Sequence, residues 1–243
     1  MPDPEASSAK DAAGLAATVV LIEDDVEIRR WLRVVLDAEG HRTVFAETGQ
    51  QGLTEVAARQ PDLVLLDLGL PDLDGVEVIR RIREWTTVPI IVISARGQEQ
   101  DKVDALDAGA DDYVSKPFGT GELLARLRVA LRHAAAVRDG AEPAVYQTGR
   151  LKVDLAARLV YVDGQEVHLT PTEYKLLAAL AHHAGKVLTH RFLLKEVWGP
   201  NFVEHTNYLR VHMSQLRSKI EAEPARPRYI LTEAGVGYRL AAV

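Results

Sequence analysis

The chain of 243 residues contains no cysteine, and this absence excludes several kinds of site. Without thiols there is no disulfide framework, no thiolate metal site and no cysteine nucleophile. Long apolar runs are also missing, because segments such as Leu63–Leu66 and Val88–Ile93 have only the length of a β-strand. Residues 1–17 contain one lysine and no apolar core, so we expect no signal peptide. These features favour a protein of the cytoplasm that does not contact a membrane.

Charge is distributed unevenly along the chain, although the net charge is only −6. Residues 17–137 carry 14 Lys and Arg against 21 Asp and Glu, whereas residues 145–243 carry 13 against 9 and hold six of the eight His. A basic region joined to an acidic one favours a polyanionic partner for the second region only. An excess of this size is also common on ordinary protein surfaces, so charge alone does not decide the question.

Strand-like and helix-like segments alternate in the first half of the chain. The strand-like segments are short and apolar, and they lie at residues 19–22, 43–46, 63–66, 90–93 and 112–114. Between them apolar residues recur with helical spacing, as at Ile28, Trp31, Leu32, Val35 and Leu36. This alternation predicts a doubly wound, five-stranded parallel sheet of the α/β class over residues 17–137. Residues 1–16 are small and polar, and we expect a disordered tail there.

The pattern changes after residues 138–144, where glycine, proline and charge without periodicity predict a linker. Over residues 145–243, short strands precede three helical stretches and a final hairpin. The strands lie at 151–155 and 159–162, the helices at about 172–183, 191–197 and 206–221, and the hairpin strands at 229–232 and 238–240. This order predicts an α+β domain of the winged helix-turn-helix type.

Four of the predicted strands in the first domain end in residues that could form one site. Glu23-Asp24 follows the first strand, Asp67 the third, Ser94 the fourth and Lys116 the fifth. In such sheets ligands bind at the carboxyl ends of the strands. Clustered carboxylates repel one another unless a cation such as Mg²⁺ neutralises them, and a carboxylate can form an aspartyl-phosphate. Each residue alone is equally typical of a solvated loop, so the prediction depends on their shared position at strand ends.

The same segments resemble the receiver domain of response regulators over residues 17–137. The matching segments are Glu23-Asp24, Asp67–Gly75, Ser94-Ala95 and Gly109–Phe118. The resemblance implies that Asp67 is the phosphoacceptor and that Lys116 pairs with the phosphoryl group. It further implies that Ser94 hydrogen-bonds to that group and that Tyr113 is the switch residue whose rotamer follows.

The resemblance also implies a Mg²⁺ cofactor. Asp24, Asp67 and the carbonyl of Gly69 would bind the ion directly, and Glu23 would act through water. Many members of the family have two aspartates where this chain has Glu23-Asp24.

The predicted fourth and fifth helices, residues 97–109 and 119–137, carry charges of both signs. Taken alone, this is a solvated face whose i,i+4 ion pairs are worth about 0.2–0.5 kcal/mol each. The resemblance to the OmpR/PhoB class implies instead a symmetric homodimer that forms on phosphorylation. The residues implied at its interface are Asp111 and the intermolecular pairs Lys102–Glu122 and Asp112–Arg126.

The helix predicted at residues 206–221 has an apolar face and a polar face. The apolar stripe consists of Leu209, Met213, Leu216 and Ile220. The polar face, which has the reach to contact base edges and phosphates, consists of Asn207, Arg210, Ser214 and Arg217. Arg228 and Arg239, at the bases of the final hairpin, are further candidates for phosphate contacts. A plain amphipathic helix would look the same, so the flanking elements are needed to favour DNA binding.

Residues 145–243 resemble the OmpR/PhoB effector domain. The matching segments are Leu169–Leu177, Gly185–Thr189, Leu194–Trp198, Val211–Lys219 and Gly235–Arg239. Within this class, segments such as Ile93–Arg96, Glu204–Thr206 and Pro224–Arg228 are similar to the KdpE regulators of high-affinity potassium-uptake (kdp) operons. The resemblance implies a KdpD-like sensor histidine kinase as phosphoryl donor, and promoter DNA and RNA polymerase as further partners.

Three alternatives remain open at this point. An aspartyl-phosphate phosphohydrolase would use a similar fold, but it needs a second carboxylate two residues after the nucleophile, where this chain has Gly69. We therefore expect a regulator and not an enzyme. An atypical receiver without phosphorylation is disfavoured by the intact set of site residues. A regulator of another operon, responding to phosphate, osmotic or envelope stress, is compatible with the same motifs.

Overall fold

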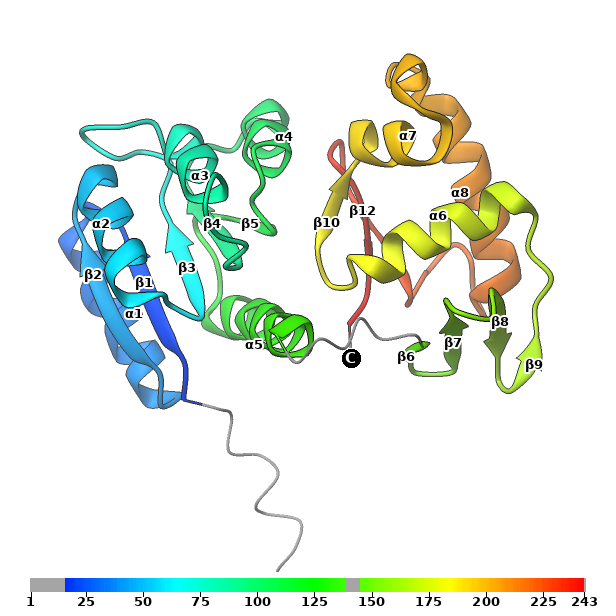
Figure 1. Ribbon diagram of the computed structural model, residues 1–243, viewed down its shortest axis with the longest axis horizontal. Coiled ribbons are helices and arrows are strands. Elements are labelled where there is room, and N and C mark those ends of the chain that lie inside the picture. Colours follow the sequence, from blue (N-terminus) through cyan, green and yellow to red (C-terminus); the bar gives the residue numbers. More distant parts are fainter. Residues whose placement is uncertain (1–15, 139–144, 243) are drawn as a thin grey trace, which may run out of the picture.

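The computed structural model describes residues 16–138 and 145–242, which form two domains (Figure 1). The predicted tail over residues 1–16 and the predicted linker over residues 138–144 fall almost entirely outside these ranges. None of the helices within them combines the length and apolarity needed to cross a membrane.

A sheet of five parallel strands forms the first domain, in the order β2-β1-β3-β4-β5. The strands are β1 (Thr18–Ile22), β2 (Arg42–Ala46), β3 (Leu63–Leu66), β4 (Ile90–Ser94) and β5 (Asp112–Ser115). The helices are α1 (Val26–Ala38), α2 (Gly49–Arg59), α3 (Gly75–Arg83), α4 (Glu99–Asp107) and α5 (Thr120–Arg138). The predicted α/β fold is confirmed, and each strand lies within one residue of its predicted position.

The helices cover both faces of this sheet (Figure 1). Successive side chains of a strand point to opposite faces. Val19 and Leu21 of β1 therefore pack in the cluster that includes α1 and α5. Val20 and Ile22 pack in the cluster that includes α2, α3 and α4. Because both faces are buried, the strands are apolar throughout, and their polar residues are confined to the strand ends.

The second domain has the predicted winged helix-turn-helix arrangement. The antiparallel sheet at its start consists of β6 (Val145–Thr148), β7 (Leu151–Asp154), β8 (Leu159–Val162) and β9 (Gln165–Glu166). Three helices follow, α6 (Pro171–His182), α7 (His190–Trp198) and α8 (Thr206–Ile220), with a 3-10 turn, η2 (Pro200–Phe202), before α8. A second sheet, in the order β10-β12-β11, consists of β10 (Val187–Thr189), β11 (Ile230–Glu233) and β12 (Gly237–Leu240).

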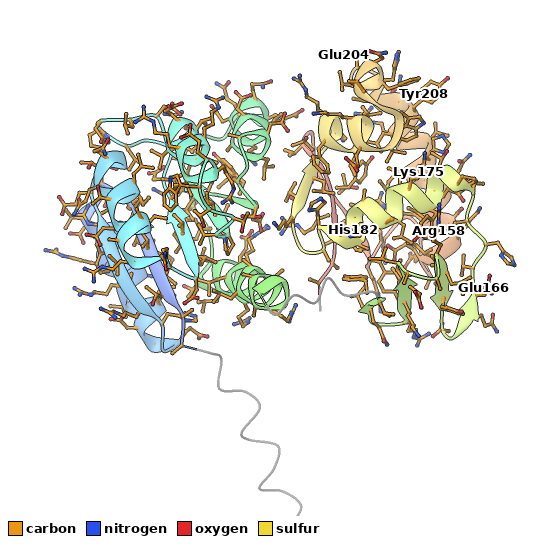
Figure 2. All side chains as sticks on the ribbon, in the orientation of Figure 1. Arg158, Glu166, Lys175, His182, Glu204 and Tyr208 are labelled. Carbon is orange, nitrogen blue, oxygen red and sulfur yellow. The ribbon has the colours of Figure 1, made fainter. Side chains whose placement is uncertain are left out.

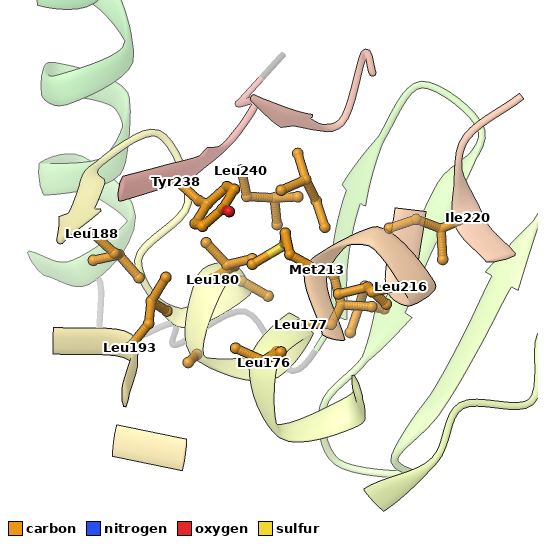
Figure 3. Packing of buried hydrophobic residues seen from close by; sticks show 14 of the residues in the cluster. Leu176, Leu177, Leu180, Leu188, Leu193, Met213, Leu216, Ile220, Tyr238 and Leu240 are labelled. Carbon is orange, nitrogen blue, oxygen red and sulfur yellow. The ribbon is translucent and has the colours of Figure 1, made fainter. Parts of the chain in front are cut away.

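The core of the second domain joins the three helices to the second sheet (Figure 3). Met213 and Leu216 of α8 pack among leucines of α6, and Tyr238 and Leu240 of β12 close the cluster from the sheet side. The predicted apolar stripe of α8 is fully buried, which fixes the opposite side of this helix as its outer face.

The two domains touch through β5, α4 and the second sheet (Figure 1). The backbone N–H of Val187 donates to the carbonyl of Asp111 at 3.3 Å. Val187 and Val236 join the apolar cluster of the first domain. The side chain of Thr189 also donates to Asp107 at 2.7 Å.

Candidate functional site

The carboxyl ends of the parallel strands bring the predicted site residues together. Because β1, β3, β4 and β5 are successive neighbours in the sheet, the residues that end them meet at one edge. Lys116 Nζ lies 2.7 Å from Asp67 Oδ2 and 2.8 Å from Glu23 Oε2. The peptide bond after this lysine, Lys116–Pro117, is cis. The fold therefore brings Lys116 into contact with Glu23, which is 93 positions away in the sequence, and with Asp67, which is 49 positions away.

Three carboxylates gather at this edge against one ammonium group. Carboxylate oxygens of Glu23, Asp24 and Asp67 all lie within 4.8 Å of one another. Glu23 and Asp67 are buried, whereas Asp24 is exposed. In the part of the chain that the structure describes, Lys116 is the side chain that forms ion pairs with this cluster. A surplus of hard oxygen ligands suits Mg²⁺, so the residues present fit the cofactor that the sequence predicts.

The two buried carboxyl groups respond differently to this environment. Burial, reinforced by the nearby Asp67, raises the pKa of Glu23 to about 7, although Lys116 opposes the shift. Burial also acts to raise the pKa of Asp67, but the hydrogen bond and charge of Lys116 outweigh it and leave that pKa below its usual value. Asp67 therefore remains an anion at neutral pH, as a nucleophile must.

Further hydrogen bonds hold the loops around Asp67. The backbone N–H of Gly69 donates to Asp67 Oδ1 at 3.2 Å. Ser94, with 1% of its surface exposed, accepts from the N–H of Arg96 at 3.2 Å. Tyr113 is buried and its hydroxyl donates to the carbonyl of Arg96, and Lys102 Nζ lies 5.7 Å from the centre of its ring. The predicted switch residues Ser94 and Tyr113 thus meet at one backbone segment.

Two arginines that the sequence analysis did not assign to the site support it. Arg29 of α1 donates to the carbonyls of Glu23 and Asp24 at 2.8 and 2.7 Å and so fixes the acidic loop. Arg96 donates to the carbonyl of Leu68 at 3.0 Å and to Asp74 at 2.9 Å, which anchors the loop after Asp67. An arginine has donors enough for several acceptors, but only the fold shows which carbonyls it reaches.

Asp25, the next acidic residue after Asp24, caps a helix. Its carboxylate accepts from the N–H groups of Glu27 and Ile28 at 2.8 and 3.0 Å, which makes it the N-cap of α1. The carboxylate of Asp25 therefore binds the start of α1 and is not one of the three carboxylates that gather around Lys116.

A second group of charges lies at the amino end of β5. Asp111 accepts from Arg83 at 2.8 Å and forms an ion pair with Lys186 at 2.5 Å. Asp112 accepts from Arg126 at 2.9 Å and from Arg239 at 2.7 Å. Lys186 and Arg239 belong to the second domain, so these bonds form part of the contact between the domains.

The predicted dimer residues are thus engaged within one chain. Arg126 binds Asp112 and, at 2.8 Å, Glu122 of its own helix. Lys102 contacts the ring of Tyr113. The intermolecular pairs stay a prediction, and Asp112 already has two arginine partners within the chain.

The predicted DNA-contacting residues fall into two groups. Asn207, Arg210 and Ser214 are exposed on the outer face of α8, and Arg228 is exposed before β11. Figure 2 shows Tyr208, from the first turn of the same helix, near Glu204 at the outer end of the domain.

Arg217 and Arg239 form the other group, because their guanidinium groups bind other parts of the protein. Arg217 donates to the carbonyl of Ile230 and the hydroxyl of Thr232. Arg239, which is 8% exposed, binds Asp112 and Glu233. In this arrangement both guanidinium groups already have partners within the protein.

Comparison with known proteins supports this architecture. The family "Response regulator receiver domain" matches residues 19–128, and "Transcriptional regulatory protein, C terminal" matches residues 164–240. The chain is 58% identical to the KDP operon transcriptional regulatory protein KdpE of Escherichia coli (strain K12), over 91% of this chain and 97% of that protein. It is 50% identical to the transcriptional regulatory protein KdpE of Mycobacterium tuberculosis (strain H37Rv), over 92% and 99%.

Among solved structures, the chain is similar to the response regulator DrrB, a Thermotoga maritima OmpR/PhoB homologue. The sequence identity is 31%, the match covers 94% of this chain and 100% of that one, and the TM-score is 0.46. The domain matches and the identities to full-length relatives confirm the predicted family: the chain belongs to the DNA-binding response regulators of the OmpR/PhoB class.

Proposed function

We propose that this regulator is switched by phosphorylation of Asp67 from a sensor histidine kinase. The observation that carries the proposal is the ion pair of Lys116 with both Asp67 and Glu23. In the transfer, an Asp67 oxygen forms a bond to phosphorus as the bond from phosphorus to the imidazole nitrogen of the donor breaks. Lys116 and Ser94 are placed to bind oxygens of the arriving phosphoryl group.

Mg²⁺ would be held by Asp24 and Asp67, with Glu23 acting through water and the Gly69 carbonyl as a further ligand. When bound, the ion would offset the negative charge that gathers on the phosphoryl oxygens. The exposed carboxylate of Asp24 and the surplus of carboxylates over cations support this assignment.

Phosphorylation then favours a homodimer through α4, β5 and α5. In the structure the second domain covers part of this face, and Arg239 binds Asp112, the carboxylate that would pair with Arg126 of the second copy. Dimerisation through this face therefore requires Arg239 to leave Asp112. This proposal makes the contact between the domains a competitor of the dimer.

The dimer would bind tandem half-sites in promoter DNA, with α8 in the major groove and RNA polymerase as a further partner. The exposed side chains of Asn207, Arg210 and Ser214 support this orientation, because they lie opposite the buried stripe of α8. The exposed Arg228 would contact phosphates. Under this proposal the protein acts in the cytoplasm, where it can reach both chromosomal DNA and the kinase domain.

The target that the relatives favour is a kdp operon for potassium uptake, and the donor a KdpD-like kinase. Two relatives named KdpE are 58% and 50% identical to this chain, and the matches cover nearly their full length. A different operon of the OmpR/PhoB class is the second candidate, since the DNA-binding response regulator MtrA of Mycolicibacterium smegmatis is also 40% identical.

Genome-wide mapping of bound DNA tests this function. Wild-type protein treated with acetyl phosphate should enrich the promoter of a potassium-uptake operon, and Asp67→Asn under the same treatment should not. Enrichment of an unrelated promoter would replace the kdp assignment and keep the regulator. Equal enrichment by Asp67→Asn would remove the link between phosphorylation and DNA binding.

A further inference from the structure

The last turn of α8 holds the first strand of the terminal hairpin. Arg217 and Glu221 are four residues apart, so their side chains lie on the same side of the helix end. Both side chains point to β11, the strand that the sequence predicts as the first strand of the wing. The side chain of Arg217 is half-buried, and Glu221 is buried, with 7% of its surface exposed.

Glu221 binds the backbone that leads into β11. Its carboxylate accepts from three consecutive N–H groups, those of Arg228 and Ile230 at 2.8 Å and that of Tyr229 at 2.9 Å. A buried carboxylate satisfied by three backbone donors is a strong and specific anchor, because hydrogen bonds to a charged acceptor are shorter and stronger than neutral ones. The anchor fixes where the strand begins relative to the helix.

Arg217 binds acceptor oxygens of the same strand, whereas Glu221 binds its N–H donors. Its Nη2 donates to the carbonyl of Ile230 at 2.6 Å and to Oγ1 of Thr232 at 2.7 Å, and its Nε lies 3.1 Å from the same carbonyl. The guanidinium carbon lies 5.4 Å from the ring centre of Tyr238 on β12, in a cation–π contact. Ile230 is therefore held at its N–H by Glu221 and at its carbonyl by Arg217.

We propose that Arg217 and Glu221 form a clamp, and that Arg217 serves DNA binding as a positioning residue for the β11–β12 hairpin. This differs from the direct DNA contact that the sequence predicts for Arg217. The inference rests on the proposed placement of α8 and the hairpin on DNA. Because its guanidinium group is bound to β11, Arg217 sets the spacing between α8 and the β11–β12 hairpin. This spacing matters because α8 and the hairpin must fit the grooves of DNA at the same time.

Hydrogen exchange of the DNA-free protein separates the clamp from a DNA contact. Arg217→Ala should speed exchange of the amides of β11 at least tenfold and leave those of β7 unchanged, since a lost hydrogen bond to a charged group weakens its local structure. The matched control Arg210→Ala, on the outer face of the same helix, should leave β11 unchanged. Unchanged β11 exchange in Arg217→Ala would contradict the clamp, because a residue that acts only on DNA has no effect in its absence.

Binding selections from a random DNA library provide the second readout. Arg217→Ala should weaken binding to all sequences about tenfold with the base preferences intact, whereas Arg210→Ala should relax preference at one base step. Arg217→Lys, which keeps the charge but not the fork, should stay close to Arg217→Ala. Wild-type binding by Arg217→Lys, or relaxed preference at a single base in Arg217→Ala, would assign Arg217 to DNA instead.

A milder variant guards against a folding defect. Thr232→Val removes one acceptor of the clamp without changing side-chain size, and it should weaken binding two- to threefold and speed β11 exchange to a smaller extent. If Thr232→Val has no effect on either readout, the clamp is wrong. If Arg210→Ala and Arg217→Ala both bind every sequence as the wild type does, the placement of α8 in the groove fails and the clamp can still be judged from exchange.

Discussion

Two acidic clusters lie at opposite ends of the same parallel sheet, and they differ in how their charge is balanced. At the carboxyl end, Glu23, Asp24 and Asp67 have the single ammonium group of Lys116 as ion-pair partner within the described chain. At the amino end of β5, each of the two carboxylates has two cationic partners. One cluster therefore has room for added positive charge, and the other does not.

This difference separates a site for chemistry from a site for contact. Unbalanced buried carboxylates are costly unless a cation binds, so the carboxyl-end cluster suits a metal ion such as Mg²⁺, as the proposed phosphoryl transfer requires. The Asp111-Asp112 cluster is balanced by arginines and a lysine from both domains, and it can only exchange one cation for another. We propose such an exchange for dimerisation: Arg239 leaves Asp112, and Arg126 of the second copy takes its place.

The largest expected effect of a substitution belongs to Lys116. Lys116→Ala removes the cation beside Asp67, and the rate of phosphoryl transfer from acetyl phosphate should fall on the order of 10²–10³-fold. Lys186→Ala, which removes a cation from the other cluster, should leave this rate unchanged. Rapid-quench phosphorylation assays compare the two, and equal losses in both variants would contradict the division of roles.

Mg²⁺ should stabilise the protein through the first cluster only. At a concentration one hundred times its Kd, the ion should raise the free energy of unfolding by about 2.7 kcal/mol, and EDTA should reverse this. Asp24→Asn should abolish most of the increase, whereas Asp112→Asn should retain it. Thermal unfolding with and without Mg²⁺ provides the test, and a wild-type response in Asp24→Asn would exclude that residue as a ligand.

Arg239→Gln should weaken the contact between the domains and shift the monomer–dimer equilibrium of the unphosphorylated protein towards dimer. We expect a shift of about tenfold, because hydrogen bonds of a buried guanidinium to a charged acceptor are worth about 1.5–3 kcal/mol. Analytical ultracentrifugation measures the shift. The control Arg210→Gln should have no effect, and Arg126→Ala should weaken the phosphorylated dimer. An unchanged constant in Arg239→Gln would show that the contact does not compete with the dimer.

The smallest effect is expected at the hairpin tip. Glu233 forms an ion pair with Arg239 at 2.7 Å, and a carboxylate near DNA phosphates is repelled. Glu233→Ala should therefore leave DNA affinity unchanged or raise it less than twofold. Fluorescence anisotropy at a fixed salt concentration checks this, since phosphate contacts depend on salt. A large loss of affinity would mean that the tip contacts DNA directly.

The cluster of Glu23, Asp67 and Lys116 was accessible to sequence reasoning because its geometry follows from the fold class. Parallel strands that neighbour one another end at one edge, so Asp67 and Lys116 had to meet once the five strands were identified. The supporting roles of Arg29 and Arg96 were not accessible, since they depend on which carbonyls happen to lie within reach. The spacing of polar and apolar residues along the chain does not predict such hydrogen bonds.

The second domain was harder to predict for a related reason. Arg239 and Asp112 are 127 residues apart, and their bond crosses a domain contact that no sequence pattern encodes. The strand β10 has only three residues and acquires its strand character from pairing with β12. Arg217 has the spacing of the polar face of α8, but it lies close enough to the buried stripe to turn towards β11 instead.

The most direct test of the central claim is the intact mass of the protein after treatment with acetyl phosphate. Wild-type protein should gain one base-labile phosphoryl group when Mg²⁺ is present and none when EDTA replaces it. Asp67→Asn should gain none under either condition, and Asp112→Asn should behave as the wild type. Phosphorylation of Asp67→Asn at the wild-type yield would contradict the assignment of Asp67 as the phosphoacceptor.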